Sequence, residues 1–68
     1  MKSKEEFEKA WKLVGGKLKT IIYRPYKDKE FVNFDSADNY LVDGDSVTIY
    51  LGNEYRNQFS LEGIMGVH

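Results

Sequence analysis

The chain is 68 residues long, which gives room for one small domain over residues 1–68 and leaves none for a second. Its composition, 41% hydrophobic and 15% aromatic, is typical of a folded domain, and the absence of cysteine excludes disulfides and thiolate metal sites. The net charge is only −1, but residues 1–29 hold nine bases against four acids, and residues 30–68 hold one base against seven acids. This asymmetry predicts either opposite electrostatic faces or two halves whose charges mix on one surface.

Residues 4–14 are predicted to form an amphipathic helix. Ser3 followed by Glu6 has the spacing of a capping box, in which side chains satisfy the free amides of a helix start. Four apolar side chains then recur at helical spacing and form one stripe: Phe7, Ala10, Trp11 and Val14. Gly15-Gly16 ends the helix, because glycine takes the left-handed conformation of a helix cap without steric cost. Acids and lysines interrupt this segment, so we expect neither a secretory leader nor a membrane span. We therefore expect a cytoplasmic location.

The rest of the chain, about residues 17–67, has the composition of short antiparallel strands separated by turns. β-branched and aromatic residues fill a run that ends at Arg24, where Pro25 removes a backbone donor. The polar residues 35–38 are predicted to form a loop. The predicted strands are, in order, 18–24, 30–34, 39–42, 46–51, a segment that carries Tyr55, Asn57 and Phe59, and a final edge strand at about 64–67.

Two compact turns flank the alternating segment 46–51. Asp43-Gly44 and Gly52-Asn53 supply the positive backbone angles that two-residue hairpin turns require, so the segment should pair with both neighbouring strands. Three apolar side chains share one of its faces: Val47, Ile49 and Leu51.

One helix followed by about five short strands predicts an α+β fold. We expect an antiparallel meander with the helix over one face or across an open end. Closure of that meander into a small SH3-like or Sm-like barrel would remove its exposed strand edges. A more open sandwich of helix on sheet is the alternative.

The residues that carry most enzyme and metal chemistry are scarce or poorly placed. The only histidine is His68, the last residue of the sequence, and it has no cysteine or second histidine to work with. Asp43, Asp45 and Glu54 match positions 1, 3 and 12 of an EF-hand loop, but Thr48 stands where that loop needs glycine. A domain this small rarely has the walled cleft that shifts the pKa of a catalytic carboxyl. We therefore expect no enzyme activity, no cofactor and no metal.

The aromatic content favours a protein-binding function. Trp11 and five tyrosines cannot all be fully buried in so small a domain, and both residue types are favoured at interfaces. If Val47 and Ile49 face the core, Tyr50 points outward beside a cross-strand neighbour. The hypothesis is a small interaction or inhibitory accessory module, of the kind that phages and mobile elements carry. It would use a sheet face or a sheet edge to bind an unidentified protein or a second copy of itself, in the latter case as a homodimer. The predicted partner-binding residues are Tyr50, Tyr55, Thr48 and Tyr40.

The alternative hypothesis is a small β-barrel that binds nucleic acid through the basic and aromatic segment 17–29. Its bases would contact phosphates while its tyrosines stack on unpaired nucleobases. A sequence pI near 5.7 argues against a dedicated nucleic-acid binder. The residues predicted for this alternative are Lys17, Lys19, Tyr23, Arg24, Tyr26, Lys27 and Lys29.

Overall fold

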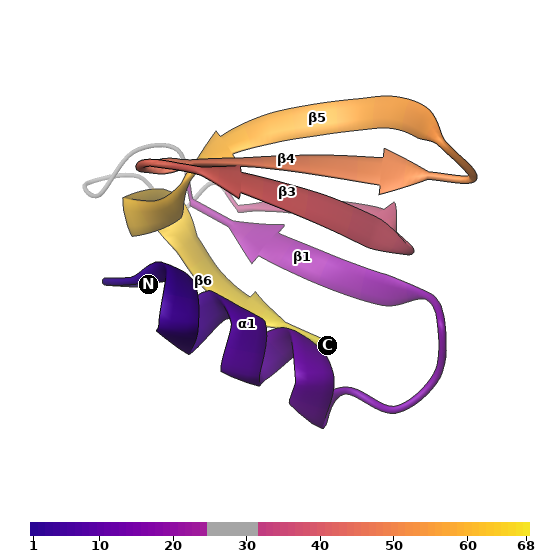
Figure 1. Ribbon diagram of the computed structural model, residues 1–68, viewed down its shortest axis with the longest axis horizontal. Helices are drawn as coiled ribbons and strands as arrows, with labels where there is room; N and C mark the ends of the chain where they lie inside the picture. The colour runs from indigo at the N-terminus through magenta and orange to yellow at the C-terminus, as the bar shows by residue number, and fades with distance from the viewer. Residues whose placement is uncertain (25–31) are drawn as a thin grey trace.

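The structure is a computed structural model that describes residues 1–24 and 32–68, and within these residues it is α+β, as predicted (Figure 1). A helix comes first, six short strands follow, and one turn of 3-10 helix precedes the last strand. The elements are α1 (Lys4–Leu13), β1 (Lys19–Tyr23), β2 (Asn33–Ala37), β3 (Asn39–Asp43), β4 (Ser46–Leu51), β5 (Glu54–Ser60), η1 (Leu61–Gly63) and β6 (Ile64–Val67). The first two residues of the strand predicted at 30–34 lie outside the described residues.

Helix α1 begins where the capping pattern predicts. The Ser3 hydroxyl accepts a hydrogen bond from the Glu6 amide at 3.2 Å, and the Glu6 carboxylate accepts one from the Lys2 amide at 3.2 Å. Phe7 and Trp11 of the apolar stripe are buried. The helix ends at Leu13, one residue earlier than predicted, because the backbone of the next residue is already extended.

The strands form two three-stranded antiparallel sheets, in the orders β2-β1-β6 and β3-β4-β5. Only Asp38 separates β2 from β3, so the chain passes from one sheet to the other within a single residue. The loop predicted at 35–38 is therefore wrong: three of its four residues lie in β2, where Ala37 pairs with Lys19 and Asp35 with Ile21. Pairing with β1 satisfies the backbone groups of this polar segment, and local sequence composition does not report such a partner.

Both predicted hairpins around β4 are present. The second turn is Gly52-Asn53, with φ of 57° and 70°, as a type I′ turn requires. The first turn consists of Gly44 and Asp45, one residue later than predicted, because Asp43 pairs with Ser46 as the last pair of its ladder. Gly44 has φ of 59° at the first central position, where a type II′ turn needs a positive angle.

The last strand does not continue a simple meander. After the 3-10 turn η1, β6 returns to pair with β1 rather than with β5. Two backbone hydrogen bonds between Thr20 and His68, of 2.6 and 2.8 Å, extend this pairing to the end of the chain. The edge strand predicted at 64–67 is therefore confirmed, while its predicted place beside the preceding strand is wrong.

The core lies between the two sheets and is completed by α1, which contacts β6 (Figure 1). The expected closed barrel is wrong, because β5 and β6 do not pair in the described part of the chain. Side chains of the helix join the core instead, and the Met1 ammonium donates to the Leu61 and Ile64 carbonyls at 3.0 and 2.7 Å. The buried core residues are Phe7, Trp11, Ile21, Ala37, Val47, Ile49, Phe59, Leu61, Ile64 and Val67. Within the described residues, no helix has the length and apolar character needed to cross a membrane.

Candidate protein-binding face

The outer surface of the β3-β4-β5 sheet collects the exposed side chains of three strands. Val47 and Ile49 are fully buried, so the residues that alternate with them in β4 point outward. Ladder pairing places three residues in each row across this surface. We call the nine positions the tyrosine face: Asn39, Tyr50 and Tyr55 in the first row, Leu41, Thr48 and Gln58 in the second, and Asp43, Ser46 and Ser60 in the third.

The apolar part of the tyrosine face lies at the end nearest the Gly52-Asn53 turn. Tyr55 is 63% exposed and Leu41 is 57% exposed. Tyr50 and Thr48 are half-buried, since they lie on the central strand β4 between β3 and β5. Cross-strand neighbours on one sheet face have Cβ atoms about 5 Å apart, so the two tyrosines are adjacent. Three of the four residues predicted to bind a partner thus share one surface.

A β-bulge in β5 creates this pair of tyrosines. The register shifts between Ile49, which opposes Asn57, and Tyr50, which opposes Tyr55, so Arg56 is the extra residue. The Arg56 guanidinium instead reaches β2, where its Nη2 and Nε lie 3.0 and 3.3 Å from Asp35 Oδ1. The bulge was not predicted, because nothing in the local sequence marks it.

Tyr40, the fourth predicted residue, lies on the opposite side of its strand and does not contribute to the tyrosine face. Its ring packs edge-on against Phe7, with centroids 5.0 Å apart, and against Trp11 at 4.7 Å. Its hydroxyl donates to Glu8 Oε2 at 2.9 Å. Burial, and then the hydrogen bond and negative charge of Glu8, raise the pKa of Tyr40 above its ordinary value.

The described residues of the basic segment do not assemble a stacking platform for nucleobases. Lys19 Nζ donates to the Gly16 carbonyl at 2.6 Å and lies 5.2 Å from the centre of the Trp11 ring. The Tyr23 ring stacks on Phe59, with centroids 4.4 Å apart. Lys17 is exposed. The Nε of Arg24 is buried and has no hydrogen-bond partner among the described residues. The other three predicted positions lie outside the described residues: Tyr26, Lys27 and Lys29.

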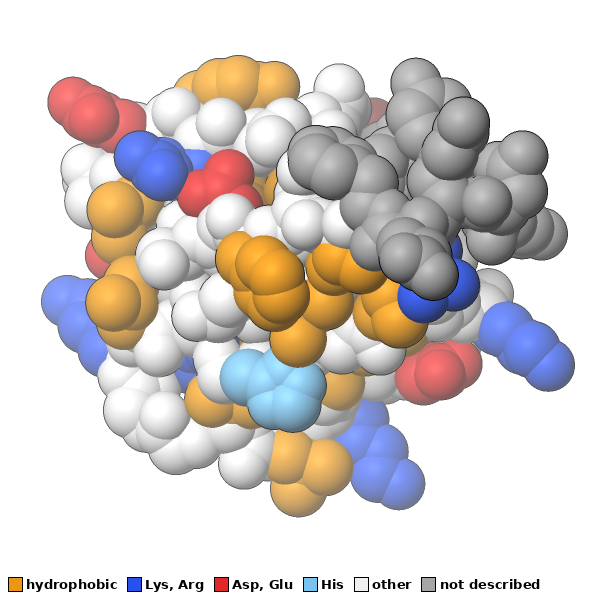
Figure 2. Space-filling model, turned by 180° about the vertical axis from the view of Figure 1, so that it is seen from behind, with side chains coloured by type: hydrophobic (Ala, Val, Ile, Leu, Met, Phe, Trp, Pro, Cys, Tyr) orange, Lys and Arg blue, Asp and Glu red, His pale blue; other side chains and the backbone are white. Residues whose placement is uncertain are grey.

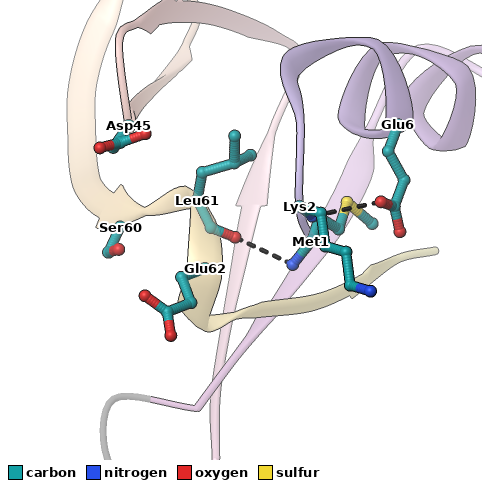
Figure 3. Close-up of a pocket in the computed structure, with 7 residues that line it drawn as sticks. All are labelled: Met1, Lys2, Glu6, Asp45, Ser60, Leu61 and Glu62. Atoms are coloured by element: carbon teal, nitrogen blue, oxygen red, sulfur yellow. Dashed lines mark hydrogen bonds between the residues drawn. The ribbon is translucent and has the colours of Figure 1, made fainter.

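Sequence reasoning missed a shallow hollow of about 740 Å³ between the start of the helix and η1 (Figure 3). Its walls carry both signs of charge, and the Met1 ammonium that points into it is bonded to the Leu61 carbonyl. In residues 1–24 and 32–68 no three potential metal ligands come together. The lining residues are Met1, Lys2, Glu6, Asp45, Ser60, Leu61 and Glu62.

A second apolar surface, also not predicted, covers the outside of the β2-β1-β6 sheet. Phe34 is 69% exposed and pairs with Ile22, which in turn pairs with Gly66. The His68 imidazole lies beside Gly66, since a Cβ built on that glycine would be 3.4 Å from Nε2. Figure 2 shows hydrophobic side chains gathered next to this histidine.

Comparison with known proteins adds no relative: no family model matches the chain, and neither the curated proteins nor the solved structures contain a significant match.

Proposed function

We propose that this protein is a small non-catalytic protein-binding module, an interaction or inhibitory accessory protein, that acts through the tyrosine face. The observation that carries the proposal is the exposure of Tyr55 and Leu41 beside Tyr50 on one sheet surface. Tyrosine is enriched in interfaces because it supplies a large contact area with two side-chain torsions and keeps a hydroxyl for a rim hydrogen bond.

The scaffold beneath the face supports the same proposal. Val47 and Ile49 anchor β4 in the core, and Asp38 holds the Gly52 amide of the adjoining turn at 3.2 Å. A partner would therefore meet a preformed surface, and the entropy lost on ordering it would be small.

The test compares the wild-type chain with a Leu41→Ser/Tyr55→Ser double variant. The wild type is immobilised and exposed to a lysate, and any protein that it retains is purified and titrated against both chains by calorimetry. We expect the double variant to bind the purified partner at least about tenfold more weakly, since truncation of central aromatic anchors commonly costs more than 1 kcal/mol.

A Phe34→Ser/Met65→Ser double variant is the matched control. It also removes two exposed apolar side chains, but from the other sheet. A purified partner that binds both double variants equally well would contradict the role of the tyrosine face.

Nucleic-acid binding through residues 17–29 remains the alternative proposal, with less support. Lys19 and Tyr23 are engaged in contacts within the protein, which leaves Lys17 as the exposed base in the described part of the segment. An amide NMR titration with short single-stranded and duplex oligonucleotides tests it. Shifts near Lys17 that vanish with added salt would favour it, because phosphate contacts release counterions.

We also propose that the fold is an opened version of the SH3-like or Sm-like barrel expected from the element order. The support is topological: one segment, β2 with β3, contributes to both sheets, and β6 returns to β1 after the 3-10 turn. An experimental structure in which β5 and β6 flank a single opening between the two sheets would agree with this proposal. Two sheets with unrelated strand directions would contradict it.

A further inference from the structure

We infer that the partner of the tyrosine face is a basic segment of another protein, with arginine or lysine on both sides of an apolar residue. This inference rests on the proposed function, and it adds the chemistry of the partner. It follows from the charges of the face, from the spacing of its rows and from the nature of its aromatic pair.

The charge of the tyrosine face is one-sided. None of its nine positions is lysine or arginine, and Asp43 is the charged residue among them. One more exposed carboxylate, that of Asp45, lies in the hairpin turn next to the third row, whereas Glu54 pairs with Leu51 on the opposite side of the sheet. In the described part of the chain, Asp43 and Asp45 form no ion pair, and the nearby Arg56 is already bonded to Asp35. A basic partner would therefore meet carboxylates that are not neutralised from within the protein.

The aromatic pair suits a guanidinium group. The faces of Tyr50 and Tyr55 carry partial negative charge, and arginine stacks on such rings more often than lysine does. Leu41, in the next row, offers an apolar contact beside this pair.

The row spacing sets the pattern of the partner. The first and third rows are four residues apart along β3, which is about 13 Å in an extended strand. Side chains on one face of an extended peptide repeat every two residues, at about the same spacing as the rows. A segment of the form basic-x-apolar-x-basic that follows β3 therefore places its apolar side chain on Leu41 and its second base beside Asp43. The long side chain of its first base then extends from Asn39 toward Tyr50 on the neighbouring strand.

The same charges argue against a second copy of the chain as the occupant. Two tyrosine faces brought together would unite the carboxylates of Asp43 and Asp45 from each copy, and like charges at an interface are unfavourable. Helix α1 does not complement the face either, because its three lysines are balanced by three glutamates. The lysines of the helix are thus spread among acids and do not form a matching basic surface.

The experiment uses three synthetic peptides that differ only in charge: acetyl-SRSLSRS-amide, acetyl-SESLSES-amide and acetyl-SQSLSQS-amide. Each is titrated into the isotope-labelled chain at low and moderate salt, and amide and tyrosine ring shifts are followed. We expect the basic peptide to shift resonances of the tyrosine face, to bind at least about tenfold more tightly than the acidic one, and to weaken as salt screens the charges.

Variants locate the interaction. Asp43→Asn and Asp45→Asn should each weaken the basic peptide about two- to fivefold, as exposed ion pairs commonly do, whereas Glu5→Gln on the helix should have no effect. Tyr55→Ser should weaken the basic peptide and Phe34→Ser should not. All five positions are exposed, and a dispersed amide spectrum of each variant confirms that it is folded.

Other outcomes overturn the inference in distinguishable ways. Equal binding of the neutral or acidic peptide at the tyrosine face would refute the basic partner and leave the proposed function intact. Shifts centred on the helix, or none with any peptide, would also refute the inference, and the purified-partner titration would still decide the proposed function. Sedimentation of the wild type as a dimer that Tyr55→Ser dissociates would make a second copy the occupant.

Discussion

At the scale of single residues, Gly63 has the least room for a side chain. A Cβ at this position would overlap the Tyr23 ring and lie 3.0 Å from the Arg24 carbonyl oxygen. The ring cannot withdraw easily because it stacks on Phe59 in the core, and the backbone is fixed by the hydrogen bond from the Arg24 amide to the Gly63 carbonyl, at 2.9 Å. This glycine is therefore required by close approach rather than by its backbone angles.

We expect Gly63→Ala to lower the free energy of unfolding by about 1–3 kcal/mol, the usual cost of forcing a group into a filled space. Urea denaturation followed by circular dichroism measures the loss. Gly15→Ala is the control, since a Cβ there meets no atom within 4 Å, and it should change the midpoint little. Equal effects at both glycines would show that the contact with Tyr23 is not the cause.

Tyr40 should make stability depend on alkaline pH. Burial and the neighbouring Glu8 raise its pKa in the folded protein above the ordinary value near 10. The folded state therefore holds this proton more tightly than the unfolded state, so the stabilisation is present below pH 10 and is lost as the pH rises through the raised pKa. We expect the urea midpoint to fall as the pH is raised above 10, and to fall less in Tyr40→Phe. If the urea midpoint falls as steeply with pH in Tyr40→Phe as in the wild type, the assignment of this pH dependence to Tyr40 is wrong.

At the scale of elements, Asp38 joins the two sheets. Its amide donates to the Tyr50 carbonyl at 3.0 Å, and its carboxylate accepts from the Gly52 amide at 3.2 and 3.3 Å. The bend between β2 and β3 is thus tied to the end of the β4-β5 hairpin, which carries the tyrosine pair.

Asp38→Ala should remove the side-chain bond and destabilise the fold by about 1 kcal/mol, with faster hydrogen exchange at the Gly52 amide. Asp38→Asn keeps an acceptor oxygen and should recover much of the loss. If exchange at Gly52 is the same in all three proteins, the carboxylate does not hold this turn.

Local patterns predicted the elements that depend on local signals. The capping pair at Ser3 and the turn at Gly52-Asn53 mark the helix start and one hairpin closely, and the alternation around Tyr50 indicated which side chains point outward. The predicted loop at 35–38 and the missed bulge depend on partners far along the chain, as in the pairing of Asp35 with Arg56. The place of Tyr40 likewise depends on the helix, so strand periodicity alone could not assign its environment.

At the scale of the whole molecule, helix α1 belongs to the core and is not an appendage. Phe7 is fully buried, while Phe34 on the outside of the β2-β1-β6 sheet is 69% exposed, so the chain offers two phenylalanines in opposite environments. A closed barrel would have filled its interior from strands alone, whereas here the helix supplies part of the apolar area that so small a domain needs.

The two phenylalanines give a direct test of that arrangement. Phe7→Ala should cost about 3–5 kcal/mol, because it leaves a cavity among the rings of Trp11 and Tyr40. A small domain has about 5 kcal/mol to lose, so the Phe7→Ala variant should show a collapsed amide spectrum at room temperature. Phe34→Ala should keep the wild-type spectrum and a free energy of unfolding within about 0.5 kcal/mol of the wild type. A folded Phe7→Ala chain whose strand resonances do not move would mean that the sheets are stable without the helix. The helix would then be free to detach, and the tyrosine face would rest on the strands alone.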